Sequence, residues 1–136
     1  MSAQLKQASI GAITLFTEDL ARSKSFYQQI FDKSIIFEDE NSAVFTFGDT
    51  MINVLAASAA PELVAPGAVG PGGAGIRAVM TVEVDDVDAM CADLARQGVT
   101  LLNGPMDRPW GIRTASFTDP GGHVWEIAHQ LPPAAS

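Results

Sequence analysis

The feature that most constrains the fold of this chain is an internal repeat of about 60 residues. One copy opens with a strand-like run at residues 9–16 and continues to Asp19; the other opens with residues 78–84 and continues to Asp86. Runs rich in β-branched and aromatic residues favour strands. An Asp directly before an apolar helical stripe is typical of an N-cap. Because each copy is too small for a core of its own, we expect the two to pack together.

The same order of elements is expected in both copies. In the first helix the apolar stripe is formed by Leu20, Ser23, Phe26, Tyr27 and Ile30. Further strands are expected at 34–37, 43–47 and 50–55 in the first copy, and at 99–102, 111–118 and 122–129 in the second. The predicted fold is α+β, with two βαβββ modules; if a helix covers one face of each sheet, the other face is free to line a shared cleft.

We expect one domain over residues 1–136. Module 1 covers about 8–56, a linker about 57–76, and module 2 about 77–130. The linker is rich in Ala, Pro and Gly, which disfavours a long regular element, although a short helical turn is expected near Pro61.

Composition excludes several classes of function. The formal net charge of −8 argues against nucleic acid and anionic membranes as partners, because both attract clustered cations. No apolar run reaches the roughly 18 residues of a membrane span, and the polar start does not resemble a secretory signal. The single cysteine, Cys91, cannot form an internal disulfide, which favours a reducing compartment. We therefore expect a soluble, cytoplasmic protein that handles a small molecule or another protein.

Three segments in this order resemble one family. They are residues 14–20 running into Ser25-Phe26-Tyr27, residues 82–89, and residues 117–126 with the turn Asp119-Pro120-Gly121-Gly122. Over about residues 8–130 the chain resembles the vicinal oxygen chelate superfamily of glyoxalase and bleomycin-resistance type proteins. The resemblance implies an α+β fold of two βαβββ modules whose curved mixed sheets form a cleft, and often a homodimer. Because this fold hosts lyases, epimerases, dioxygenases, thiol transferases and binding proteins, it does not by itself define the function.

The resemblance also implies where a metal would bind. In metal-dependent members, four strand positions supply His and Glu ligands, and here they fall on Ala12, Asn53, Val79 and Glu126. Alanine and valine have no donor atom, and an Asn amide oxygen is a weak ligand. Because a stable site usually takes at least three protein ligands, we predict no metal ligands and no cofactor; a divalent metal is disfavoured.

Glu126 is the main candidate for a catalytic or ligand-binding group. Strand alternation puts it on one face with Val124 and Ala128, and puts His123 and His129 on the other. It is a candidate base, or a contact for a cationic or hydroxyl-bearing ligand. It could equally be a relic of an ancestral metal site, paired with Arg or Asn53. We expect His123 to bond backbone near the hairpin and His129 to be exposed.

A Gly/Pro-rich loop at residues 103–113 is the second candidate site. Arg108 and Arg113 can grip an anion, and Trp110 offers a flat stacking surface. The alternative is a structural loop in which Arg108 pairs with Asp107 or Asp119.

The expected function is small-molecule binding without the usual divalent metal. Candidate ligand-binding residues are Asn53, Arg108, Trp110, Arg113 and Glu126, and the partners expected are a small molecule and a second copy of the chain. The alternative is a glyoxalase-like lyase or isomerase, or a dioxygenase-related enzyme, that uses Glu126 with an altered metal site. Whether the protein is an enzyme stays open at this point.

Overall fold

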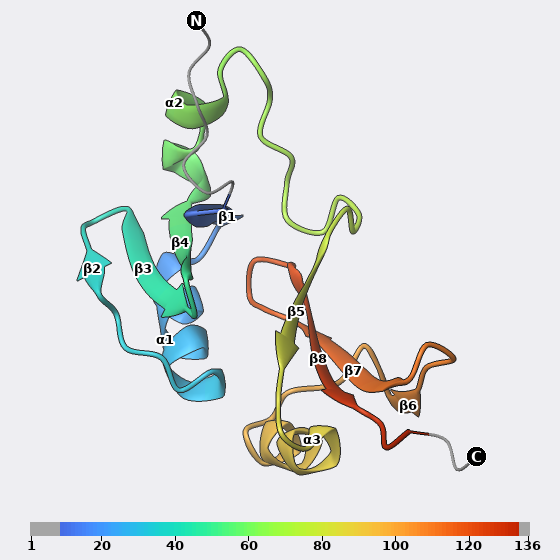
Figure 1. Cartoon of the computed structure of the whole chain (residues 1–136). Coiled ribbons are helices and arrows are strands. Elements are labelled where there is room, and N and C mark those ends of the chain that lie inside the picture. The colour runs from blue at the N-terminus through green and yellow to red at the C-terminus, as the bar shows by residue number, and fades with distance from the viewer. Residues whose placement is uncertain (1–8, 134–136) are drawn as a thin grey trace, which may run out of the picture. The chain divides into compact units, whose positions relative to one another are not determined.

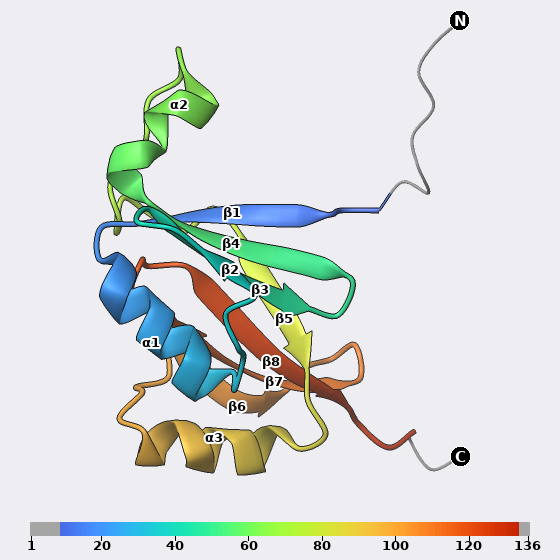
Figure 2. The same cartoon turned by 90° about the vertical axis from the view of Figure 1, so that its left-hand side faces the viewer.

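The structure is a computed structural model that describes residues 9–133. The chain divides into two compact units, with the boundary between Val69 and Gly70. In each unit a helix lies against one face of a four-stranded mixed sheet (Figures 1 and 2). This α+β arrangement of two βαβββ modules confirms the fold predicted from the repeat.

The first unit contains one sheet with the strand order β1-β4-β3-β2. Its elements are β1 (Ala12–Thr17), α1 (Leu20–Ile30), β2 (Phe37–Glu38), β3 (Ser42–Phe47), β4 (Thr50–Ala56), the 3-10 helix η1 (Ala57–Ala59) and α2 (Pro61–Val64). Strand β1 runs parallel to β4, and the other pairs are antiparallel. Helix α2 is the short helical turn expected near Pro61.

The second unit repeats this topology with the order β5-β8-β7-β6. Its elements are β5 (Val79–Glu83), α3 (Val87–Arg96), β6 (Asn103–Asp107), β7 (Ile112–Thr118) and β8 (Val124–Gln130). Strand β5 pairs in parallel with β8, as β1 does with β4.

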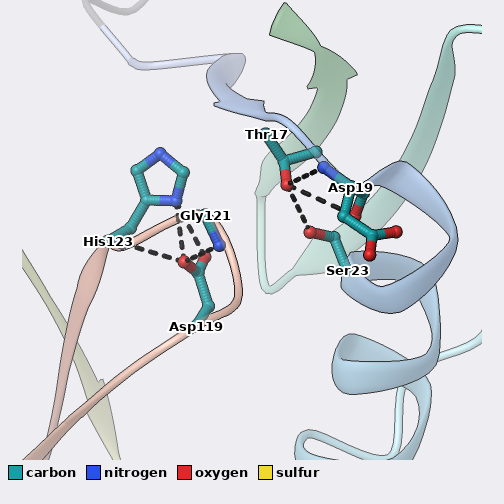
Figure 3. A network of polar contacts seen from close by, with 6 residues as sticks. All are labelled: Thr17, Asp19, Ser23, Asp119, Gly121 and His123. Atoms are coloured by element: carbon teal, nitrogen blue, oxygen red, sulfur yellow. Dashed lines mark hydrogen bonds and ion pairs between the residues drawn. The ribbon is translucent and has the colours of Figure 1, made fainter. Parts of the chain in front are cut away.

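Both principal helices begin at the predicted N-caps. The Asp19 carboxylate accepts a hydrogen bond from the backbone N–H of Arg22 at 3.0 Å, and Asp86 accepts one from Ala89 at 3.1 Å. Each bond satisfies a backbone donor that the first helical turn leaves without a partner. The start of α1 is further tied to β1 by the hydroxyls of Thr17 and Ser23, which lie 2.8 Å apart (Figure 3).

Each unit buries an apolar layer between its helix and its sheet. In the first unit Tyr27 of α1 is fully buried, and its ring centroid lies 5.3 Å from that of Phe45 on β3. In the second unit Leu94 of α3 is fully buried, as is Phe117 of β7. The helical stripe and the alternating strand residues therefore point where the sequence period places them.

Two strand predictions are wrong. Residues 99–102 form no strand, and the run predicted at 34–37 yields only β2. The second strand of the second unit is instead β6, within residues that the sequence indicated to be a loop. Gly104 and Pro105 suggested that loop, but β6 is an edge strand with a register shift between Asn103 and Met106, and proline is tolerated at such places.

Candidate functional site

The second sheet has one face covered by α3 and one face turned away from it. Arg113 of β7 bonds Asp88 of α3, and His129 of β8 accepts a hydrogen bond from the backbone N–H of Val87. Ser116 lies three positions from Arg113 along β7, and Glu126 lies three positions from His129 along β8. Because successive strand residues alternate between faces, Ser116 and Glu126 point away from α3. We call the face opposite α3 the open face of the second sheet because α3 does not cover it, although Ser116 and Thr114 on this face are buried.

Four polar residues stand directly opposite one another across this open face. They are Thr81 on β5, Glu126 on β8, Ser116 on β7 and Asn103 on β6, and we call them the polar row. The hydroxyl of Thr81 donates to Glu126 Oε1 at 3.0 Å. Glu126 is half-buried and is the one charged member of the row. The polar row therefore presents an oriented carboxylate flanked by neutral hydrogen-bonding groups.

The equivalent row of the first unit is half apolar. It runs from Thr14 through Asn53 and Val44 to Phe37, on the face opposite α1. The Asn53 amide lies 3.4 Å from the Thr14 hydroxyl, and its Oδ1 is buried without a hydrogen-bond partner among residues 9–133. The repeat has thus diverged in chemistry, because a neutral amide in one unit corresponds to a carboxylate in the other.

The four strand positions that the resemblance associates with a metal lie on β1, β4, β5 and β8. Two of them hold Ala12 and Val79, which offer no donor atom. Within the described part of the chain, no three or more His, Cys, Asp or Glu side chains gather where they could hold a metal ion. The donor set at these positions does not fit the family's metal, and the expectation of no cofactor stays a prediction.

The loop predicted at residues 103–113 is mostly strand, and only the turn between β6 and β7 remains outside it. In this turn Arg108 donates from Nε to the Thr114 hydroxyl at 2.9 Å. Its guanidinium carbon lies 5.9 Å from the centre of the Trp110 ring, and Trp110 is 67 % exposed. Thr114 is two residues from Ser116 and shares its face, so Arg108 contacts the same open face as Glu126.

Arg113 lies on the opposite side of the sheet from Glu126. Its guanidinium bonds Asp88 at 2.9 and 3.0 Å and Asp107 at 2.8 Å. The Asp88 and Asp107 carboxylates raise the pKa of Arg113 above its ordinary value, and Arg113 in turn lowers the pKa of Asp88. The structure therefore brings Arg108 to the open face with Glu126 and holds Arg113 against α3.

Both histidines have partners that differ from those expected. His123 contacts the buried Asp119 carboxylate through Nδ1 at 2.8 and 2.9 Å, where we expected a bond to backbone (Figure 3). His129 is half-buried, where we expected exposure, because its Nδ1 accepts the Val87 N–H at 2.8 Å. Strand alternation correctly predicted that both side chains lie on the face opposite Glu126. It could not predict their hydrogen-bond partners, which lie in a turn and at the start of a helix.

Sequence reasoning missed Thr81, Ser116 and Asn103 as companions of Glu126. One signal was present: a threonine stands five residues before each N-cap Asp, at Thr14 and Thr81. Ser116 and Asn103 could not be found from the sequence, because their partnership depends on the strand register.

Two βαβββ units, each a four-stranded mixed sheet with a helix on one face, define the class of glyoxalase-fold proteins. The model of the Glyoxalase/Bleomycin resistance protein/Dioxygenase superfamily matches residues 9–127. The chain belongs to this superfamily. A comparison with curated proteins found no match.

Solved structures show the same fold at low sequence identity. A glyoxalase/bleomycin resistance protein/dioxygenase from Nocardioides is 22 % identical with a TM-score of 0.81, over 98 % of this chain and 93 % of that one. A family enzyme from Burkholderia phytofirmans PsJN is 24 % identical with a TM-score of 0.77, over 91 % and 100 %. A lactoylglutathione lyase from Agrobacterium tumefaciens is 20 % identical with a TM-score of 0.72, over 89 % and 92 %.

Among residues 9–133, no helix has the length and apolar character needed to cross a bilayer.

Proposed function

We propose that this protein binds a small molecule on the open face of the second sheet without a divalent metal. The observation that carries the proposal is the polar row, in which the Glu126 carboxylate is held by Thr81 and is the one charged member. A half-buried carboxylate with spare acceptor capacity favours a ligand that carries a cation or hydroxyl groups.

Two further features support a cationic, partly flat ligand. The net charge of −8 attracts cations over long range. The exposed Trp110 ring in the β6–β7 turn offers an aromatic surface, on which the neighbouring Arg108 already lies. Such a ligand is of the kind that bleomycin-resistance proteins sequester.

Isothermal titration calorimetry with metal-free bleomycin, a cationic ligand with flat heteroaromatic rings, tests the proposal. We expect saturable binding that Glu126→Gln weakens about tenfold or more, since a charge-assisted hydrogen bond is lost. The matched control is Glu62→Gln, which removes the same charge from exposed α2 in the first unit and should leave affinity unchanged. Equal weakening by both variants would point to net charge alone and contradict a site at Glu126.

A second candidate is an enzyme that uses Glu126 as a general base. The hydrogen bond from Thr81 favours it, because it fixes one carboxylate oxygen and leaves the other available to take a proton. The test is lactoylglutathione formation from the hemithioacetal of methylglyoxal and glutathione, with and without added Zn²⁺ or Ni²⁺. Turnover that is lost in Glu126→Gln would favour the enzyme over the binding protein. Stoichiometric metal in the purified protein would overturn the proposal that the site works without a metal.

The proposal extends to assembly and location. We expect a homodimer, as in many superfamily members, and sedimentation velocity is the direct measurement. We also expect a cytoplasmic protein, because its single cysteine gives it no internal disulfide.

A further inference from the structure

The two histidines of the chain are held in opposite tautomers. A carboxylate can only accept hydrogen bonds, so the proton between His123 and Asp119 resides on His123 Nδ1. A backbone N–H can only donate, so His129 Nδ1, which accepts from Val87, carries no proton. In the neutral state the proton of His129 is therefore on Nε2, whereas Nε2 of His123 carries the lone pair.

Asp119 is well suited to hold His123 in this state. Its side chain is 3 % exposed, and its Oδ1 also accepts the backbone N–H groups of Gly121 and His123, at 3.1 and 2.8 Å. These bonds fix the carboxylate within the Asp119–His123 turn and favour its ionised form. The imidazole is consequently oriented by an anion that cannot easily rotate away.

The second ring nitrogen of His123 is available for chemistry. The His123 side chain is 24 % exposed, and no described residue hydrogen-bonds to its Nε2. Figure 3 shows this nitrogen on the edge of the ring turned away from Asp119. A buried carboxylate that orients a histidine through Nδ1 and leaves Nε2 open is the base half of a hydrolytic triad.

We propose that His123 is a nucleophilic site that hydrolyses small activated acyl esters, separately from ligand binding at Glu126. Its Nε2 lone pair forms a bond to the acyl carbon, the bond from that carbon to the alcohol oxygen breaks, and the alkoxide or phenolate leaves with the electron pair. The Asp119 carboxylate stabilises the resulting cationic acyl-imidazole through Nδ1–H. Water then attacks the acyl carbon and gives up one proton to the departed alkoxide or phenolate. The bond between that carbon and Nε2 breaks, which releases the carboxylic acid and returns the lone pair to Nε2.

His129 does not share this reactivity. Its Nδ1 is used by the N-terminus of α3, and its Nε2 carries the proton. The charged groups facing it are Arg113, directly opposite on β7, and Asp88 at the start of α3. Because Nδ1 accepts a hydrogen bond and Nε2 is protonated, His129 has no free lone pair and provides an internal control.

The experiment begins with a chain that carries Cys91→Ser, which removes the competing thiol, and is otherwise unchanged. Two-dimensional NMR that correlates ring carbon-bound protons with ¹⁵N identifies the tautomers directly. We expect an Nδ1–H tautomer for His123 and an Nε2–H tautomer for His129. The same tautomer at both residues would overturn the proposal without any variant being made.

Reactivity is then measured with diethyl pyrocarbonate and with p-nitrophenyl acetate. We expect peptide mass mapping to show His123 modified at least about tenfold faster than His129, and p-nitrophenolate release to fall about tenfold or more in His123→Gln. His129→Gln should keep the wild-type rate. Asp119→Asn should slow both reactions, and a circular dichroism spectrum checks that it folds. Equal modification of both histidines, or ester hydrolysis that survives His123→Gln, contradicts the proposal, whatever is found for Glu126.

Discussion

Arg113 of β7 donates two hydrogen bonds to the carboxylate of Asp88 of α3, from Nε to Oδ2 at 2.9 Å and from Nη2 to Oδ1 at 3.0 Å. A third bond, from Nη1 to Asp107 of β6, is 2.8 Å long. One guanidinium thus joins a helix to two strands of the second unit, using the planar donor geometry that lysine lacks. Arg113, a candidate ligand-binding residue in the sequence, thus connects elements of the fold.

The pH dependence of this contact has a definite sign. Arg113 lowers the pKa of Asp88 below its ordinary 3.8, so the unfolded chain takes up the proton more readily than the folded one. The stabilisation is complete above the ordinary pKa and is lost as the pH falls through the lower folded value. The Tm gap between wild type and Asp88→Asn should therefore be constant from about pH 8 to about pH 5 and shrink below that. The pKa of Asp39 is also lowered, but Asp39 is present in both the wild type and Asp88→Asn, so its contribution cancels in the Tm difference. A gap that widens in acid would contradict this assignment.

Gly104 should tolerate no side chain. Its φ is +86°, and a Cβ there would lie 2.5 Å from the backbone oxygen of Thr114 on β7. We expect Gly104→Ala to destabilise the protein by about 3 kcal/mol or more, measured by urea unfolding, because both backbone strain and a backbone clash must be relieved.

Two other glycines separate these causes. Gly111 has a φ of +90° with open space around it, and Gly11 has neither a positive φ nor a near neighbour. Gly111→Ala should cost about 1–2 kcal/mol, and Gly11→Ala close to nothing. If Gly104→Ala lowers the free energy of unfolding no more than Gly111→Ala does, the clash with the Thr114 backbone costs nothing, because β7 shifts to make room.

The two N-caps should contribute equally to stability. Asp19 and Asp86 each accept one backbone N–H in the first turn of their helix. Replacing either by Ala should cost about 1 kcal/mol in chemical denaturation, whereas replacement by Asn, which retains the acceptor, should cost far less. If Asn and Ala were equally destabilising, the contribution would come from the charge and not from the cap.

Cys91 of α3 should react slowly. Burial, followed by the nearby Asp88 carboxylate, raises the pKa of this thiol above 9.0, which reduces the reactive thiolate at neutral pH. Iodoacetamide at about pH 8 should alkylate the folded protein several-fold more slowly than the protein unfolded in guanidinium. Equal rates in the two states would mean that the thiol is neither buried nor perturbed.

The sequence by itself determined the repeat, the order of elements and the capped starts of both helices. These features follow from local chemistry: period-2 and period-3.6 apolar patterns, and an Asp that satisfies donors within its own turn. The same alternation placed Glu126 on the face opposite His129, because side-chain direction along one strand needs no knowledge of its neighbours.

Only the tertiary structure decided which polar groups meet. The strand register places Thr81 and Ser116 beside Glu126. Pairing with β7 makes the Gly-Pro segment the edge strand β6. The hydrogen bonds to Asp88 hold Arg113 on the face covered by α3. The opposite tautomers of His123 and His129 likewise depend on partners supplied by a turn and a helix end. Hydrogen bonds between residues distant in sequence are fixed by packing and register, and a linear pattern does not encode these pairings.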